Sequence, residues 1–349
     1  MTTLTAPAST EERANLRPVP WRRMAWVIWR QHRVALAGVA VFLGALAAYV
    51  WVAGNHLHDV HAAALACHPS TSSACGDLIT KFNLMNHVLS GGYVLQAVPA
   101  LIGAFLGAPL LARELETGTF RYAWTQGFGR RRWTLAKLVV LALVVTAAAG
   151  ALGALFSWYY QPYFSTANPA LNLNGSSRFA LGLFNLQGVA FAAWTLAAFA
   201  IGALAGVLIR RVVPAIVATL TAYTALALVT ANVLRRHYRA PLVRSNRSVP
   251  GSVWIMNQWW TKGGKVAFTG RPPNELVERL CPNPPVAALH KPSSGTIVQC
   301  LAQHGYTQWT RYQPASRFWS FQSIEGAWLL VLSVLLIAVT AWLVGRRAA

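Results

Sequence analysis

The stretch LVVLALVVTAAAGALGALFSW, residues Leu138–Trp158, contains no charged residue. A helix of about 20 mostly apolar residues is long enough to cross the hydrocarbon core of a membrane. Five further stretches have the same character, and the six expected spans are residues 34–53, 93–112, 138–158, 179–209, 212–234 and 326–344. We therefore expect an all-α membrane protein whose six-helix transmembrane domain occupies residues 34–344.

The composition agrees with this interpretation. The chain has 349 residues, of which 55% are hydrophobic and only 11% are charged, whereas soluble domains carry about 25% charged residues. Its mean hydropathy is +0.41. The net charge of +21 is typical of nucleic-acid binding, but the basic residues are divided between two sides of the membrane, so we expect no nucleic-acid partner. We interpret the large excess of arginine over lysine as a sign of a GC-rich bacterial genome.

The spans contain polar and small residues but none of Asp, Glu, Lys or Arg. The long fourth span is expected to tilt or break near Asn185 and Gln187. Without a carboxylate inside a span, the chain has no evident carrier for proton or ion coupling. The energy for any transport would then come from another protein.

Two pairs of glycines stand at the spacing that lets helices approach closely. They are Gly103 with Gly107 in the second span and Gly202 with Gly206 in the fourth. Such pairs serve either packing within one subunit or association between subunits. In a chain this rich in alanine and glycine, packing within one subunit is the simpler reading.

The basic residues of the short connections set the orientation, because cytoplasmic loops carry an excess of Lys and Arg. They gather in four segments that we place in the cytoplasm, namely residues 1–33, 113–137, 210–211 and 345–349. The two short outer loops, 54–92 and 159–178, hold only Lys81 and Arg178. Both termini are therefore expected in the cytoplasm, and the protein is expected in the plasma membrane of a bacterium.

The last outer loop, residues 235–325, holds twelve basic residues. Long loops cross the membrane largely regardless of charge. Arg235 and Arg236 directly follow the fifth span and run against the orientation rule. Because the loop is long and rich in Trp and Tyr, we expect a small folded cap rather than a partly disordered surface loop.

The amino-terminal region, residues 1–33, begins with a polar stretch that lacks an apolar core, so we expect no cleaved signal peptide. The first span would act as an uncleaved anchor. Residues 19–33 place Trp21, Met24 and Ile28 at helical spacing, which predicts an amphipathic helix in the membrane interface. The alternative is a plain cytoplasmic extension of the first span.

All four cysteines lie in the predicted outer loops. Cys67 and Cys75 stand in the first loop, and Cys281 and Cys300 in the last. Disulfides persist in oxidising compartments, so we expect the pairs Cys67–Cys75 and Cys281–Cys300 from proximity within each loop. Four cysteines allow three pairings, and unpaired thiols are the other alternative.

A short histidine-rich stretch, HLHDVH, lies at the outer end of the first span. It contains His56, His58, Asp59 and His61, residue types that bind zinc or copper. Polar residues crowding a membrane boundary explain the same pattern, so we expect no metal here and keep the three histidines only as weak candidates.

Motifs for catalysis and nucleotide binding are absent from the sequence. KGGKV at residues 262–266 lacks the spacing and the hydroxyl residue of a phosphate-binding loop. We therefore expect no enzyme activity and no cofactor in this chain.

The connector between the second and third spans, RELETGTFRYAWTQGFGRRRW (Arg113–Trp133), holds two of the nine acidic residues, Glu114 and Glu116. Acidic residues contribute little to membrane orientation. The pattern predicts a short helix that ends at Gly118. It would either dock a cytoplasmic partner or form a solvated turn.

The stretch ELETGTFRYAWTQGFGRRRWTLAK (residues 114–137) resembles the cytoplasmic segment of ABC-2 type transporter permeases. The matching positions are Glu114, Gly118, Thr119, Arg130 and Lys137. Residues 202–228 and 311–347 are also similar to bacterial permeases of this kind. The long last loop departs from the family pattern.

The resemblance implies a permease subunit that forms the translocation pathway of an exporter. ATP and Mg²⁺ would bind to a separate ATPase subunit, and a second permease copy or paralogue would complete the complex. A hydrophobic small molecule or lipid would be the substrate. The segment 113–121 would be the coupling helix, with partner-contacting residues Arg113, Glu114, Glu116, Thr117, Gly118, Thr119 and Arg121.

Two other functions remain open at the level of sequence. The chain could be a membrane sensor or assembly protein that uses its external loop. It could also be a membrane enzyme that uses His56, His58 and His61. The sensor predicts no ATPase partner, and the enzyme predicts metal dependence.

Overall fold

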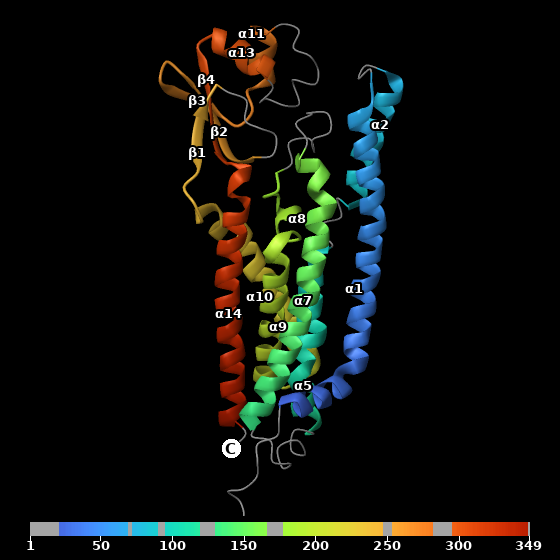
Figure 1. Cartoon of the computed structure of the whole chain (residues 1–349). Helices are drawn as coiled ribbons and strands as arrows, with labels where there is room; N and C mark the ends of the chain where they lie inside the picture. The colour runs from blue at the N-terminus through green and yellow to red at the C-terminus, as the bar shows by residue number, and fades with distance from the viewer. Residues whose placement is uncertain are drawn as a thin grey trace, which may run out of the picture.

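A computed structural model describes residues 21–68, 72–89, 95–118, 130–165, 177–246, 253–281 and 295–347. The chain forms an elongated bundle of helices with a small sheet-containing domain at one end (Figure 1). We call this domain the cap and that end of the bundle the cap end. The carboxyl-terminal ends of α5 and α14 lie at the opposite end, which we call the connector end.

The predicted spans are largely helical, and the first, third, fifth and sixth helices extend beyond the predicted ends. The bundle consists of α1 (Trp21–Ala66), α4 (Ala97–Ile102), η2 (Gly103–Gly107), α5 (Ala108–Thr117), α7 (Arg130–Ser165), α8 (Leu181–Phe184), α9 (Gly188–Ile209), α10 (Val212–Val229), η3 (Thr230–Leu234), η4 (Arg235–His237) and α14 (Phe318–Arg347). Within the described residues, six helical rods are long and apolar enough to cross a membrane, which confirms the expected number of spans.

Helix α9 is the central element of the bundle. It contacts α5, α7, α10 and α14, and most of its side chains are buried. The predicted break in the fourth span is confirmed: α8 ends at Phe184 and α9 begins at Gly188, which has a φ of +59°. A β-carbon at Gly188 would lie 3.0 Å from Gln322 Oε1, so both the backbone conformation and the available space favour glycine.

The two glycine pairs pack against each other inside one chain. Gly103 and Gly107 belong to the π-helical turn η2, and Gly202 and Gly206 lie on α9. A β-carbon on Gly107 would lie 2.7 Å from the Phe199 carbonyl oxygen. The contact therefore brings two backbones together, and the prediction of packing within one subunit is confirmed.

Helix α1 is much longer than a membrane is thick. A helix of 46 residues spans about 69 Å, against a hydrocarbon core of about 30 Å. Beyond residue 53 it continues as a stalk, and α2 (Ser73–Leu89) packs beside it (Figure 1). The segment 54–92 was predicted only as an outer loop, but its described part is helical over residues 54–66 and 73–89, where Leu57, Val60 and Phe82 have apolar partners.

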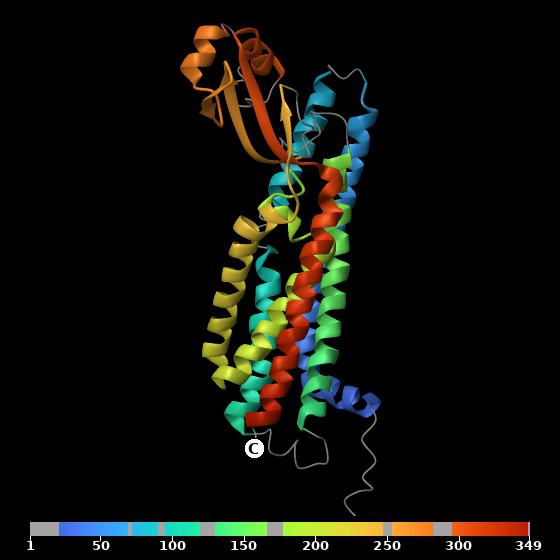
Figure 2. The ribbon, with the colours of Figure 1, turned by 90° about the vertical axis from the view of Figure 1, so that its left-hand side faces the viewer.

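The first turns of α1 bend away from the axis of the rest of the helix (Figure 2). Met24 and Ile28 are buried, while Trp26 and Trp29 are exposed. The helix predicted over residues 19–33 therefore exists from Trp21 onward and is continuous with the first span. Its position in the membrane interface stays a prediction.

The prediction of an all-α membrane protein is confirmed for the bundle, and the cap adds a small sheet to it. Its antiparallel sheet has the strand order β1-β4-β2-β3, with β1 at Leu242–Ser245, β2 at Trp254–Lys262, β3 at Lys265–Thr269 and β4 at Tyr306–Gln313. Strands β2 and β3 are joined through Gly263 and Gly264, both with positive φ. Two residues of this kind form a tight hairpin turn, which explains the KGGKV stretch.

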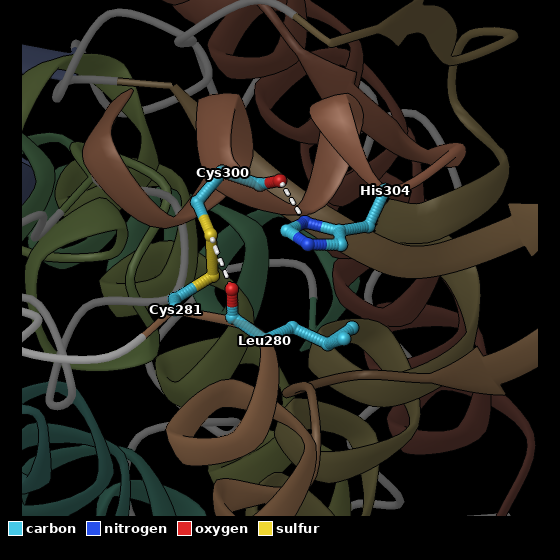
Figure 3. Close-up of a disulfide and its surroundings, with 4 residues drawn as sticks. All are labelled: Leu280, Cys281, Cys300 and His304. Carbon is cyan, nitrogen blue, oxygen red and sulfur yellow. Dashed lines mark hydrogen bonds between the residues drawn. A yellow bond between two sulfur atoms is a disulfide. The ribbon is translucent and has the colours of Figure 1, made fainter.

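Two short helices, α11 (Asn274–Leu280) and α13 (Gly295–Gln303), form the core of the cap with the sheet. Trp260 is fully buried there. Cys281 and Cys300 form a disulfide, beside which His304 Nδ1 lies 3.0 Å from the Cys300 carbonyl oxygen (Figure 3). Cys67 and Cys75 form the second disulfide, at the turn between α1 and α2. Both predicted cysteine pairs are confirmed.

A glycine comparison tests the close packing around α9. Gly202→Ala is expected to lower the thermal denaturation midpoint in detergent, because overpacking of this kind costs about 1–3 kcal/mol. Gly44→Ala on α1 meets no atom within 4 Å and is expected to be neutral or to stabilise by about 0.5–1 kcal/mol. Equal shifts for the two variants would contradict the backbone contact.

Candidate functional site

 
The candidate site begins at the connector end of α5 (Ala108–Thr117), where the stretch RELET forms the last turns of the helix. Gly118 follows with a φ of +71° and closes the helix in the left-handed region, as predicted for the break in the connector. Arg113 and Thr117 are exposed on this last turn. Thr119 and Arg121, the other predicted partner-contacting residues, lie outside the described residues.

Glu114 joins three helices at this end. It accepts hydrogen bonds from Lys137 Nζ on α7 and from Gln31 Nε2 on α1, the latter at 3.0 Å. Lys137 is fully buried and also lies 3.5 Å from the Leu110 carbonyl oxygen. A buried ammonium group that lost its carboxylate partner would be strongly destabilising, so this ion pair fixes α7 against α5.

Glu116 joins α5 to a fourth helix. Its Oε2 accepts a hydrogen bond of 3.1 Å from the backbone N–H of Val212, the first residue of α10. The first N–H groups of a helix have no partner inside the helix, and a carboxylate is favourable there because of the helix dipole. Through two carboxylates, the end of α5 is therefore bonded to α1, α7 and α10.

These contacts revise the interpretation of Glu114 and Glu116. The sequence predicted solvent-exposed charges that contact a partner, whereas the structure gives both carboxylates partners within the chain. Contact with another protein stays a prediction for the whole set of connector residues. Arg113 is exposed and forms no ion pair within the described part of the chain.

A second buried ion pair lies toward the cap end. Arg235 and Glu325 are both almost completely inaccessible. Arg235 donates from Nε to Glu325 Oε2 at 3.0 Å and from Nη2 to Oε1 at 2.7 Å. This two-point geometry is the strong form of an arginine–carboxylate pair. It connects η4, at the end of the fifth span, to α14.

The surrounding residues satisfy the remaining polar atoms of this pair. Trp194 Nε1 donates to Glu325 Oε1 at 2.8 Å, and the Tyr238 hydroxyl donates to Oε2 at 3.3 Å. Arg235 also donates to Asn185 Oδ1 at 2.6 Å, in the break between α8 and α9. Burial, together with the charge of Glu325, raises the pKa of Tyr238, which keeps its hydroxyl a donor.

The sequence did not reveal these buried charges because each lies next to a predicted boundary. Lys137 precedes the third span by one residue, Arg235 follows the fifth by one, and Glu325 precedes the sixth by one. The helices continue past those boundaries. The expectation of spans without charged residues was therefore wrong for the helices as they are, although all three charges are paired.

The histidine stretch has a packing role. The His58 ring stacks on Trp158 with centroids 4.7 Å apart, and the His61 ring lies 5.4 Å from that of Phe82. His56 is exposed. Among the described residues, no group of three His, Cys, Asp or Glu side chains is arranged to hold a metal ion.

Comparison with known families bears on this arrangement. The family described as ABC-2 membrane transporter related matches residues 39–235, more than half of the chain. The chain belongs to this family. No significant match is found among curated proteins or among solved structures.

Membership in the ABC-2 family makes the chain a multi-pass membrane protein with a permease-like role. Members of the family are generally membrane subunits without enzyme activity of their own. The matched residues include the connector, Lys137 and Arg235, and they end before the cap and α14. The partner of Arg235, Glu325, thus lies outside the part of the chain that carries the family match.

A substitution series tests the ion pair at the connector end. Glu114→Gln is expected to destabilise the protein by about 3 kcal/mol, because Lys137 would remain buried without a carboxylate. Lys137→Met added to this variant is expected to recover most of the loss. Thermal denaturation in detergent measures both, and an unchanged midpoint for Glu114→Gln would contradict the role of the pair.

The pair toward the cap end is tested in the same manner. Glu325→Gln is expected to destabilise by about 3–5 kcal/mol, since Arg235 loses its buried counter-charge. The double variant Arg235→Met/Glu325→Leu removes both charges and is expected to be closer to the wild type. The single variants Arg235→Met and Glu325→Leu complete the comparison. If the loss of stability in the double variant equalled the sum of their two losses, the two residues would not act as a pair.

Proposed function

We propose that this chain is the permease subunit of an ABC-2 type exporter, driven by ATP hydrolysis on a separate ATPase subunit. The observation that carries the proposal is the bonding of the α5 end to three other helices through Glu114 and Glu116. Under this proposal the segment from Arg113 to Arg121 is the coupling element that contacts the ATPase.

The contacts provide a mechanical route from the connector into the membrane. A displacement of the α5 end would pull on α7 through Lys137, on α1 through Gln31 and on α10 through the Val212 N–H. Packed helices respond by shifting between discrete arrangements rather than by deforming continuously. One push at the connector would therefore move several helices together.

An external energy source is consistent with the contacts of Glu114 and Glu325. Glu114 is bonded to Lys137, and Glu325 accepts hydrogen bonds from Arg235, Trp194 and Tyr238. A carboxylate that carries protons across a membrane has to gain and lose them during each cycle. Two carboxylates held by cations are poorly suited to that task, which favours ATP as the source of energy.

We place the connector end in the cytoplasm and the cap outside, in the plasma membrane of a bacterium. The excess of basic residues at the connector end supports this orientation, as do the two disulfides at the other end. Arg235, which seemed to run against the rule, is neutralised by Glu325 in a buried pair. Of the two adjacent arginines, only Arg236 remains exposed.

A hydrophobic small molecule or lipid is the proposed substrate class. A hollow of about 570 Å³ lies between α1 and α7 and is lined by apolar side chains, among them Leu36, Leu43, Val144 and Leu152. Its volume is in the range of sites for small molecules. A second copy or a paralogue of the chain would complete the transporter.

Co-purification with candidate ATPase subunits tests the proposal. The variant Arg113→Glu/Arg121→Glu reverses two positive charges of the connector and leaves Glu114 and Glu116 unchanged, so their bonds to Lys137, Gln31 and Val212 should persist. We expect it to lower ATPase recovery by about tenfold or more. Arg244→Glu/Arg271→Glu in the cap makes the same change of charge and is expected to leave recovery unchanged.

Two outcomes would contradict the proposal. If no ATPase co-purifies with the folded wild-type chain, the exporter loses its energy source and a sensor that uses the cap becomes the better explanation. If the cap variant reduces recovery as strongly as the connector variant, the connector is not the docking element.

A further inference from the structure

A basic hollow lies between α7 and α14 at the connector end. It has a volume of about 530 Å³ and is lined by Arg131, Arg132, Leu135, Ala338, Ala341 and Trp342. The first helical turn of α7 and the last turns of α14 form its two sides. None of the contacts described for the connector involves this hollow.

Two arginines are held in place here without a carboxylate: Arg131 lines the hollow, and Arg346 lies over the ring of Trp342, which also lines it. Arg131 lies against the backbone of Gly345, where a β-carbon would come within 2.8 Å of the arginine Cγ. The Arg346 guanidinium lies 4.5 Å from the centre of the Trp342 ring. Neither arginine forms an ion pair with any carboxylate in the described part of the chain. Their positive charge is thus available to an external anion.

The wall of the hollow is apolar and continues along the lipid-facing surface. Leu135 and Trp342 are partly exposed at 38% and 46%. Farther from the connector end, Val139 on α7 and Leu335 on α14 are exposed as well. Tryptophan beside arginine at the end of a spanning helix is typical of the membrane interface. The hollow therefore presents cations at one end and hydrocarbon surface at the other.

We propose that this hollow binds an anionic phospholipid, whose phosphate is engaged by Arg131 and Arg346 and whose acyl chains lie along Leu135 and Leu335. Basic pockets between spanning helices on the cytoplasmic side suit anionic headgroups. Guanidinium groups match phosphate oxygens in geometry as well as charge. A soluble anion would leave the apolar wall uncovered, and an acidic protein surface would not reach along it into the membrane.

The site has a consequence for the bundle. Helix α7 carries Lys137, the partner of Glu114, and α14 carries Glu325, the partner of Arg235. A lipid held between α7 and α14 would bridge the two helices that anchor the buried ion pairs. The inference rests on the proposed orientation, with the connector end in the cytoplasm, and it does not depend on the proposed ATPase coupling.

The test uses the full chain, purified in a mild detergent and examined by native mass spectrometry with added phosphatidylglycerol or phosphatidylcholine. We expect the wild type to retain phosphatidylglycerol in preference. Arg131→Gln/Arg346→Gln is expected to reduce that preference by about tenfold or more. The matched control is Arg210→Gln/Arg211→Gln, which removes two exposed arginines from the turn between α9 and α10 at the same end.

A second variant separates the apolar part of the site from its charge. Ala338→Phe is expected to fill the hollow and reduce lipid retention while both arginines remain. Thermal denaturation in phosphatidylcholine verifies that each variant is folded. A variant that does not fold is replaced by Arg131→Lys/Arg346→Lys, which keeps the charge and is expected to weaken the preference through the loss of the guanidinium geometry.

Three outcomes would overturn the inference. Equal retention of the two lipids by the wild type would show that the hollow has no headgroup preference. An equal loss of preference in the control variant would show a general effect of charge. Displacement of the lipid by inorganic phosphate at millimolar concentration would show a site for a soluble anion instead of a phospholipid.

Discussion

The ion pair between Lys137 and Glu114 is the constraint on which the arrangement of the connector end depends. A lysine inside a spanning helix is unfavourable unless it is paired, and Lys137 is fully buried. Its nearest carboxylate belongs to α5, so α5 and α7 have to meet there. Gln31 and the Val212 N–H then attach α1 and α10 to the same short helical end. The start of the connector, as far as Gly118, is thus part of the bundle.

At each of its two buried charge sites, the bundle joins helices through an ion pair between residues far apart in the sequence. The Arg235–Glu325 pair joins the fifth and sixth rods, and its Asn185 contact reaches the break before α9. Between the two sites, the glycine contacts bring α9 against η2 with no side chain between the backbones. Movement of one rod past another is therefore restricted to arrangements in which these bonds persist or are exchanged.

Local sequence patterns predicted much of this fold, but they could not predict contacts between residues that are far apart in the sequence. The apolar runs located the six spans, Gly118 marked the end of α5, and the spacing of the cysteines indicated both disulfides. Partners of buried charges could not be found in this way, because Glu114 meets Lys137 and Arg235 meets Glu325 only after folding. The sheet of the cap was missed although the Gly263–Gly264 turn is a readable hairpin signal.

The central claim is that movement of the connector passes through the Glu114–Lys137 pair. The most direct measurement is the distance between spin labels at Leu143→Cys on α7 and Val331→Cys on α14, with the ATPase partner nucleotide-free and then ATP-bound. Both positions are exposed, and the described residues include no free cysteine. The account predicts an ATP-dependent change that is lost in Glu114→Gln/Lys137→Met. The same change in both proteins would contradict it.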